Sequence, residues 1–303
     1  MGTVVADNLS ADIQRFQDSL AHRSVHTQAA YKRDVADFLA FVAGQNVSQW
    51  NAVDSKLVRA YVSDQHRRGA NGRSIARGLS ALRSLFKFLM AEGSMSSNPA
   101  QHVKAPRSER RLPRALDVDQ MAHMLAEDAS RPIDIRDRAM WEMLYSAGIR
   151  VSELVGLDRS DVDLGHGQAR VLGKGNKERD VPLGRYAIAA LRRWYEVRVE
   201  WASADEKAVF VSQQGKRLTT RTVQLRLRQW ASRQGIDINV HPHMLRHSFA
   251  SHMLESSGDL RAVQELLGHA NISTTQIYTH LDFQRLADVY DQTHPRARQR
   301  KRQ

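Results

Sequence analysis

The first hundred residues repeat apolar side chains at intervals of three and four positions, which is the spacing of one face of an α-helix. The first two repeats are Leu9, Ile13, Phe16 and Leu20, and then Tyr31, Val35, Phe38 and Val42. Thr27 is a suitable N-cap for the second helix, and a third helix is predicted from about Asp54 to Gly69. Residues 1–105 are therefore predicted to form a small helical bundle.

A fourth predicted helix of this bundle ends at Gly93 and combines an apolar face with a basic one. The apolar positions are Ile75, Leu79, Leu82, Phe86 and Leu89. The basic side chains away from them are Arg73, Arg77, Arg83 and Lys87. Such a stripe is compatible with a solvated helix face, and equally with contact to the phosphates of a nucleic acid. These four residues are candidate DNA-binding positions.

The helical pattern stops in SSNPAQHVKAPRSERRLPRAL, which contains three prolines and a run of basic residues. We interpret residues 106–114 as a basic interdomain linker, long enough to pass partway around a duplex. Asp117-x-x-Gln120 then has the character of a capping box at the start of a new helix.

Residues 115–303 are predicted to form a mixed α/β domain that is mostly helical. A helix from about Ile133 ends at Gly148, and QARVLGKGNKERDVPL predicts a β-hairpin with a Gly-rich turn. AVFVSQQGKRL is a second, shorter strand-turn-strand signal. Further helices are predicted around 184–201, 219–233, 243–257 and 259–267.

The charge of the chain changes this picture most. Its 45 Lys and Arg residues outnumber 33 acidic ones, which gives a net charge of +12 and a pI near 10.3, and both halves are positive. This favours a nucleic-acid partner, although a basic protein without such a partner fits the charge too. The absence of Cys, of a signal-like N-terminus and of a long apolar run leads us to expect a cytoplasmic protein that does not enter membranes.

Breaking a phosphodiester without losing its bond energy requires a nucleophile that stays attached to phosphorus, cations on the non-bridging oxygens, and an acid for the leaving oxygen. The second domain contains residues of these types in order along the chain. They are Arg150 after a helix stop, Lys174 at the hairpin turn, His243 and Arg246 on one helix face, His269, and Tyr278. Arginine suits the oxygens because its guanidinium is permanently charged and forks onto phosphate.

Each of these residues has an ordinary structural explanation when it is taken alone. Arg150 suits a helix end, and Tyr278 beside Ile277 resembles a core aromatic residue. His243 and His247, with His241 nearby, have the spacing of a metal-binding helix, but no cysteine and no third carboxylate ligand accompany them, so we expect no metal. Lys177 and Arg179 are interpreted as DNA-backbone contacts or solvated charges.

Together the motifs resemble those of the tyrosine recombinase family. The matching segments are AGIRVSELVGL, GKGNKER, HPHMLRHSFASHML, LLGHANISTTQIYTH and LDFQRLADVYDQTHPRA. The resemblance implies a SAM-like core-binding domain for the N-terminal bundle and a catalytic domain for the remainder. It also implies DNA strand exchange through a 3′-phosphotyrosine, with no cofactor, no ATP and no metal.

The resemblance further implies a role for each matching residue. Arg150 and Arg246 would clamp the scissile phosphate, and Tyr278 would attack it. Lys174 would protonate the leaving 5′-oxygen, His243 would assist proton transfer, and His269 would hydrogen-bond a non-bridging oxygen. Glu153 would support the site as an orienting carboxylate.

Within the family, the closing segment resembles the XerC type of chromosome-dimer-resolving recombinase more than the XerD type. This implies a dif-type DNA site, a heterotetramer with a XerD-like partner, and an FtsK-like DNA translocase as a further partner. The apolar residues Leu281, Phe283, Leu286, Val289 and Tyr290 suit a short helix. From periodicity it packs on its own domain, whereas the resemblance favours docking on a neighbouring protomer. A phage or integron integrase and a DNA-binding protein without activity are the alternative functions.

Overall fold

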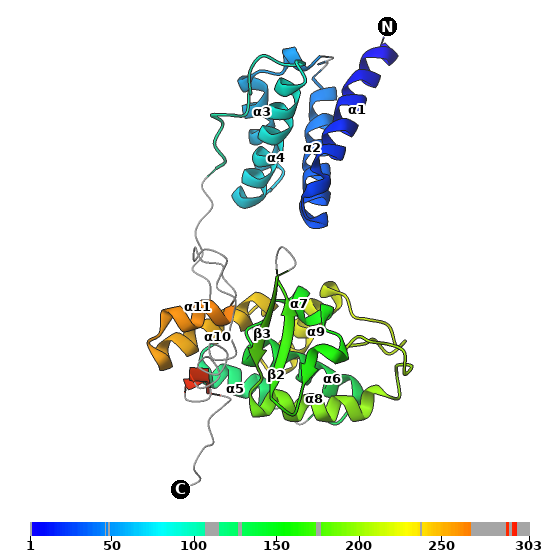
Figure 1. Ribbon diagram of the computed structural model, residues 1–303. Helices are drawn as coiled ribbons and strands as arrows, with labels where there is room; N and C mark the ends of the chain where they lie inside the picture. The colour runs from blue at the N-terminus through cyan, green and yellow to red at the C-terminus, as the bar shows by residue number, and fades with distance from the viewer. Residues whose placement is uncertain are drawn as a thin grey trace. The chain divides into compact units, whose positions relative to one another are not determined.

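The computed structural model of the chain describes residues 2–45, 47, 49–106, 115–126, 129–173, 177–236, 238–267, 289–290 and 293–295. The chain divides into two compact units, Met1–Arg111 and Leu112–Gln303 (Figure 1). Each unit has a hydrophobic core of its own. Most of the predicted linker, from Arg107 to Arg114, lies outside the described residues. The proposed limits of the linker therefore stay a prediction.

The first unit is a helical bundle, as its apolar spacing predicted. Its elements are α1 (Gly2–Ser19), η1 (Leu20–His22), α2 (Val25–Ala43), η2 (Trp50–Ala52), α3 (Ser55–Arg67) and α4 (Gly72–Ala91). Aromatic rings from three of the helices meet in its core, where Phe38 lies edge-on to both Tyr61 and Phe86. Burying rings of this size contributes roughly 2–3 kcal/mol each to folding.

The helix starts of this unit depend on short polar side chains. Asp54 caps α3 and Asn71 caps α4, each by accepting a hydrogen bond from a backbone N–H three residues later. The prediction of Thr27 as the cap of α2 is wrong. Ser24 holds that place, with Thr27 N donating to its Oγ at 3.3 Å. Thr27 is already inside the helix, so α2 begins one turn earlier than expected.

The second unit surrounds a small sheet with helices. Its elements are α5 (Val118–Ala126), α6 (Pro132–Ser146), α7 (Val151–Gly156), η3 (Arg159–Asp161), β1 (Val162–Asp163), β2 (Gln168–Leu172), β3 (Glu178–Pro182), α8 (Arg185–Arg198), α9 (Thr220–Arg233), α10 (Pro242–Ser257) and α11 (Leu260–Leu267). The strands are antiparallel in the order β1-β2-β3. The predicted fold class, mainly helical with a mixed α/β second domain, is confirmed.

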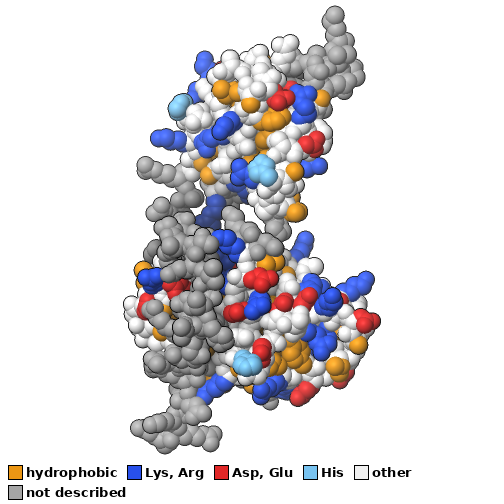
Figure 2. Space-filling view, viewed as in Figure 1, with side chains coloured by type: hydrophobic (Ala, Val, Ile, Leu, Met, Phe, Trp, Pro, Cys, Tyr) orange, Lys and Arg blue, Asp and Glu red, His pale blue; other side chains and the backbone are white. Residues whose placement is uncertain are grey.

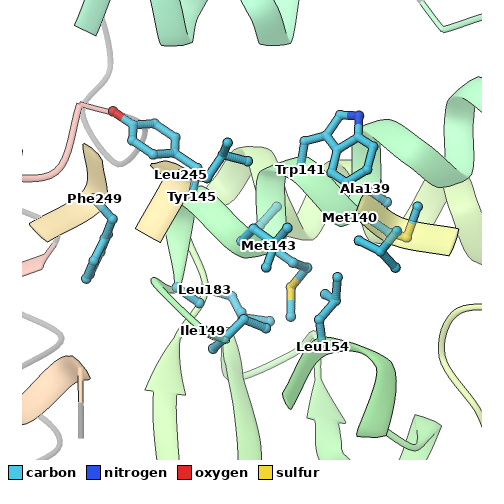
Figure 3. Close-up of a cluster of buried hydrophobic side chains, with 14 of the residues drawn as sticks. Ala139, Met140, Trp141, Met143, Tyr145, Ile149, Leu154, Leu183, Leu245 and Phe249 are labelled. Atoms are coloured by element: carbon cyan, nitrogen blue, oxygen red, sulfur yellow. The ribbon is translucent and has the colours of Figure 1, made fainter. Parts of the chain in front are cut away.

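Helix α6 is the centre of this unit and packs against α7, α8 and α10. Nearly all of its residues are buried, including charged ones such as Asp134 and Asp137, so it lacks the single apolar face of a surface helix. Figure 3 shows Trp141, Met143 and Tyr145 of this helix pointing into the core. Leu154 of α7 and Phe249 of α10 enter the same core from other directions.

Two turn predictions in the second unit have different outcomes. The QARVLGKGNKERDVPL hairpin is confirmed as β2 and β3, with Val171 opposite Arg179 and Ala169 opposite Val181. The AVFVSQQGKRL segment contains only isolated bridges, between Val211 and Arg217 and between Asp158 and Ala208. The Asp117–Gln120 capping box is confirmed by reciprocal hydrogen bonds of 3.1 and 2.7 Å.

Part of the chain's last segment is described, and it packs within its own unit. Tyr290 is fully buried, and its ring stacks on His294 with centroids 4.8 Å apart. His294 in turn lies 5.0 Å from the ring of Tyr145 on α6. For these residues the structure corresponds to packing in cis. Leu281, Phe283 and Leu286 lie outside the described residues.

Candidate active site

The site begins where α6 ends. Gly148 has a φ of +58°, and a Cβ built on it would lie 2.3 Å from the ring of Phe249 on α10. Only glycine accepts both this conformation and this close approach. The turn directs Ile149 into the core and leaves Arg150 as the residue before α7, with 33% of its side chain exposed. Arg150 is therefore fixed at its base and open to solvent at its charged end.

Arg246 approaches the same turn from α10. It is buried, and it donates hydrogen bonds to the carbonyl oxygens of Gly148 and Leu267. Burial, followed by repulsion from Arg150, lowers the pKa of Arg246 to about 10. One glycine thus links the two arginines, because its backbone positions Arg150 and its carbonyl holds Arg246.

Glu153 is the carboxylate at the centre of the site, and its side chain is only 1% exposed. It accepts from the backbone N of Arg150 at 2.8 Å and from Arg150 Nη1 at 2.7 Å. Arg179 on β3 forks onto the same carboxylate, with Nη1 to Oε1 at 2.9 Å and Nη2 to Oε2 at 3.0 Å. Burial alone would raise the pKa of Glu153, but the hydrogen bonds from Arg179 and Arg150 lower it below its ordinary value.

Arg179 is the site residue that the sequence interpretation missed. Its side chain is 9% exposed and ion-paired, so the expectation of a solvated charge or DNA-backbone contact is wrong. The alternation of the strand carried a signal for this position. Val181 is fully buried, and residues two apart in a strand face the same side of the sheet, so Arg179 faces the core as well.

The charges of this group do not balance. Three guanidinium groups, those of Arg150, Arg179 and Arg246, are close enough to interact around one carboxylate. The excess positive charge lies where protein replaces much of the water, so it attracts an anion more strongly than a surface cluster does. Such an arrangement suits a phosphate group, which Arg150 can reach because its side chain is partly exposed.

His243 lies on α10 one turn before Arg246 and is exposed. His241 has a different part in the structure, because its Nδ1 accepts from Met244 N at 3.2 Å and so caps the helix. Among the residues that the structure describes, no three His, Asp or Glu side chains come together in a way that would hold a metal ion.

Lys174, His269 and Tyr278 lie outside the described residues. Residues just before two of them do reach the site. A Cβ on Gly173 would lie 3.6 Å from Arg179 Nη1 and 4.0 Å from Glu153 Oε1. Leu267 supplies the carbonyl that Arg246 binds. The structure therefore brings together Arg150, Glu153 and Arg246, and the chain leading to Lys174 and to His269 starts from their surroundings.

The basic residues of α4 divide into two kinds. Arg77 binds Asp34 of α2 with two bonds of 2.8 Å, and Arg83 donates to the carbonyls of Ala100 and Val103. Arg73 and Lys87 are exposed. A surface hollow of about 740 Å³ lies beside Lys87 in this unit, lined by residues that include Arg23, Tyr31, Arg83, Lys87, Asn98 and His102. Figure 2 shows Lys and Arg side chains on the visible surface of both units.

No helix in the described part of the chain is long and apolar enough to cross a bilayer. Residues 114–285 match the Phage integrase family, and residues 13–93 match the Phage integrase N-terminal SAM-like domain. The Tyrosine recombinase XerC of Salmonella typhi is 49% identical over 296 residues, which cover 97% of this chain and 98% of that protein. A relative of the same name from Actinobacillus pleuropneumoniae serotype 7 is 49% identical, over 92% of this chain and 90% of its own.

Solved structures share this fold at lower identity. XerH recombinase in a post-cleavage complex with palindromic difH substrate has a TM-score of 0.69 at 23% identity, covering 91% of this chain and 82% of that one. A lambda integrase (75–356) dimer on a COC′ core site has a TM-score of 0.70 at 19% identity, covering 89% of this chain and 99% of that one.

Proposed function

The chain belongs to the phage integrase family of tyrosine recombinases, as its motifs predicted, and from this we propose that it exchanges DNA strands at a dif-type site to resolve chromosome dimers. The family reaction cleaves and rejoins DNA. The observation that supports the proposal best is the group around Glu153, where Arg150 and Arg246 meet with excess positive charge. A scissile phosphate is the anion that such a group suits.

In the proposed reaction, the phenol oxygen of Tyr278 attacks phosphorus and the bond to the 5′-oxygen breaks. The product is a 3′-phosphotyrosine and a free 5′-hydroxyl, and the reverse attack by another 5′-hydroxyl rejoins the strand. Arg150 and Arg246 hold the non-bridging oxygens, with His269 as a further donor. His243 accepts the phenol proton, and Lys174 donates one to the leaving oxygen. The bond energy is retained throughout, so ATP is not consumed.

The first unit is proposed to bind the DNA through α4. Arg73 and Lys87 are exposed and suit direct contacts with phosphates. Arg77 leaves 45% of its side chain exposed while it holds Asp34, and Arg83 borders the surface hollow beside Lys87. These contacts would supply affinity with little sequence information, because phosphates are the same at every base pair.

The proposed assembly has four protomers on two duplexes, with a XerD-like recombinase as partner and an FtsK-like translocase as regulator, in the cytoplasm. High identity to XerC proteins over nearly the whole chain supports this choice over a phage integrase. Docking of the closing segment on a neighbour, from Leu281 up to the residue before Val289, is part of the proposal. The burial of Tyr290 in its own unit supports cis packing for the end of that segment.

The test is covalent trapping on a suicide DNA that carries a nick beside the cleavage position, so that the cut cannot be resealed. We expect the protein to form an adduct at Tyr278, located by peptide mapping. Tyr278→Phe should abolish the adduct and keep DNA affinity, because binding depends mainly on Lys and Arg contacts. An adduct at another tyrosine, or none with the unmodified protein, would contradict the proposed reaction.

The role of Lys174 has a separate test. Replacing the 5′-oxygen at the cut by sulfur makes a leaving group that does not need an acid. Lys174→Ala should therefore be impaired on ordinary DNA and regain cleavage on the 5′-thio substrate. Equal impairment on the two substrates would assign the acid to another residue.

A further inference from the structure

Arg179 differs from Arg150 in where its donors point. Nη1 and Nη2 both bind Glu153, and Nε points to the carbonyl of Leu266 at 3.4 Å. Its side chain is 9% exposed, compared with 33% for Arg150. Because Nε, Nη1 and Nη2 are all directed to Glu153 or Leu266, we do not assign Arg179 to the substrate phosphate. Its effect on the reaction must pass through Glu153.

Each carboxylate oxygen of Glu153 accepts one hydrogen bond from Arg179 and one from Arg150. Oε1 accepts from Nη1 of both arginines, and Oε2 accepts from Arg179 Nη2 and from the backbone N of Arg150. One carboxylate cannot neutralise two guanidinium groups. If Arg179 were absent, Glu153 and Arg150 would form a closed ion pair in a buried place, where their attraction is strong. Arg150 would then have less charge to offer a phosphate.

We propose that Arg179 is a positioning residue of the recombinase reaction, which occupies and neutralises Glu153 so that Arg150 is aimed at the scissile phosphate with its charge uncompensated. The inference rests on the proposed function. Gly173 lies beside this ion pair, because a Cβ at that position would be in van der Waals contact with Arg179 Nη1 and Glu153 Oε1. The ion pair therefore lies next to the residue that precedes Lys174.

The chain offers a matched control on the same hairpin. Arg170 on β2 pairs with Asp180 on β3, with Nε to Oδ1 at 2.9 Å, and its side chain is 57% exposed. Arg170→Gln removes the same charge and breaks an arginine–carboxylate pair of the same hairpin, but does not touch Glu153. Exposed pairs of this kind contribute little to stability.

The experiment measures single-turnover adduct formation on two suicide substrates, one with a normal scissile phosphodiester and one with a neutral methylphosphonate in its place. On the phosphodiester we expect Arg179→Gln to slow cleavage on the order of 100-fold, the cost of a misplaced catalytic group. On the methylphosphonate, which needs less positive charge, the loss should shrink to about tenfold or less. Arg170→Gln should cleave both substrates at nearly the normal rate.

A second comparison tests the route through Glu153. The double variant Arg179→Gln with Glu153→Gln removes the carboxylate that would capture Arg150, so it should cleave faster than Arg179→Gln alone. Arg179→Lys keeps the charge but not the fork, so it should fall between the unmodified protein and Arg179→Gln. Thermal unfolding shows whether Arg179→Gln folds. If it does not, Arg179→Lys replaces it in both comparisons.

Two results would overturn the inference. The first is an equal loss on both substrates, which indicates general damage to the fold. The second is a double variant no faster than the single one. Failure of the proposed function looks different, because the unmodified protein would then form no adduct at Tyr278 on the phosphodiester substrate. Retained adduct formation by the unmodified protein and by Arg170→Gln separates the two cases.

Discussion

Two clusters of arginine and carboxylate among the described residues of the second unit differ in how their buried charges balance. The site cluster consists of Glu153 with Arg150, Arg179 and Arg246. The α6–α9 cluster consists of Asp134 and Asp137 with Arg131, Arg136, Arg226 and Arg233. In the latter, Asp137 has no exposed surface and binds Arg136 at 2.7 Å and Arg226 at 2.5 Å. Both clusters have two more arginines than carboxylates, so formal charge does not separate them.

The difference lies in which charges are withdrawn from water. In the α6–α9 cluster, buried Arg136 and mostly buried Arg226 face two buried carboxylates, whereas Arg131 remains 64% exposed. In the site cluster, two nearly buried arginines face a single buried carboxylate. Unbalanced buried charge costs stability, and proteins that retain it use it for binding or catalysis. We infer that the α6–α9 cluster holds α6 and α9 together, and that the site cluster binds an anion.

The largest effect should come from Arg150→Gln. Loss of one donor to the developing charge of the transition state costs about 100- to 1,000-fold in rate. Because Arg150 is partly exposed, the free energy of unfolding should change little. Adduct formation on the suicide substrate and urea unfolding measure the two quantities. A variant that cleaves normally, or that loses activity only because it unfolds, would remove the distinction between the clusters.

Arg226→Gln should have the opposite result. It removes one of the two arginine partners of a fully buried carboxylate, which costs up to about 3 kcal/mol of folding free energy. The cleavage rate per folded molecule should stay the same, because Arg226 binds Asp137 and not the site. Arg131→Gln is the control, since it belongs to the same cluster but is mostly exposed and should cost less than about 1 kcal/mol. A cleavage defect in folded Arg226→Gln would give the α6–α9 cluster a part in the reaction.

Gly148→Ala tests the turn that positions Arg150 and binds Arg246. A methyl group at a φ of +58° and 2.3 Å from the Phe249 ring must displace either the turn or α10. We expect about 2 kcal/mol of destabilisation from the backbone strain and a loss of cleavage, because both arginines depend on this turn. The double variant with Phe249→Leu relieves the contact but not the strain, so it should recover only part of the stability. Full recovery would show that the φ angle has no role.

The smallest effect concerns pH. The pKa of Glu153 is lowered in the folded protein, so its contribution to stability is complete above its ordinary value of 4.5 and is lost as the pH falls through the lowered value. The unmodified protein should exceed Glu153→Gln in unfolding free energy at pH 7, and this advantage should narrow only below pH 4.5. Urea unfolding from pH 7 to pH 3 measures it. If the difference in unfolding free energy already narrowed near pH 6, the lowered pKa of Glu153 would be contradicted.

Local patterns in the sequence specified much of the fold. The helix spacing, the capping box at Asp117 and Gln120, and the pairing of β2 with β3 depend on interactions between residues close together in the chain. The motifs also singled out Arg150, Glu153 and Arg246, which the structure brings together, whereas their roles in the reaction stay a proposal. The prediction of two paired strands in the AVFVSQQGKRL segment was wrong. Its β-forming residues are buried in the core, but they form only isolated bridges.

The sequence by itself determined which residue types are present and which elements carry them. Only the tertiary structure decided which charges are buried and which of them share a carboxylate. Arg179 binds a residue 26 positions earlier, and Arg246 binds carbonyls 98 positions before it and 21 after it. Arg77 was expected on a solvated or DNA-facing stripe, but it binds the carboxylate of Asp34, which lies 43 positions earlier on α2. The cost of a charge depends on the protein and water around it, and packing between distant elements sets that environment.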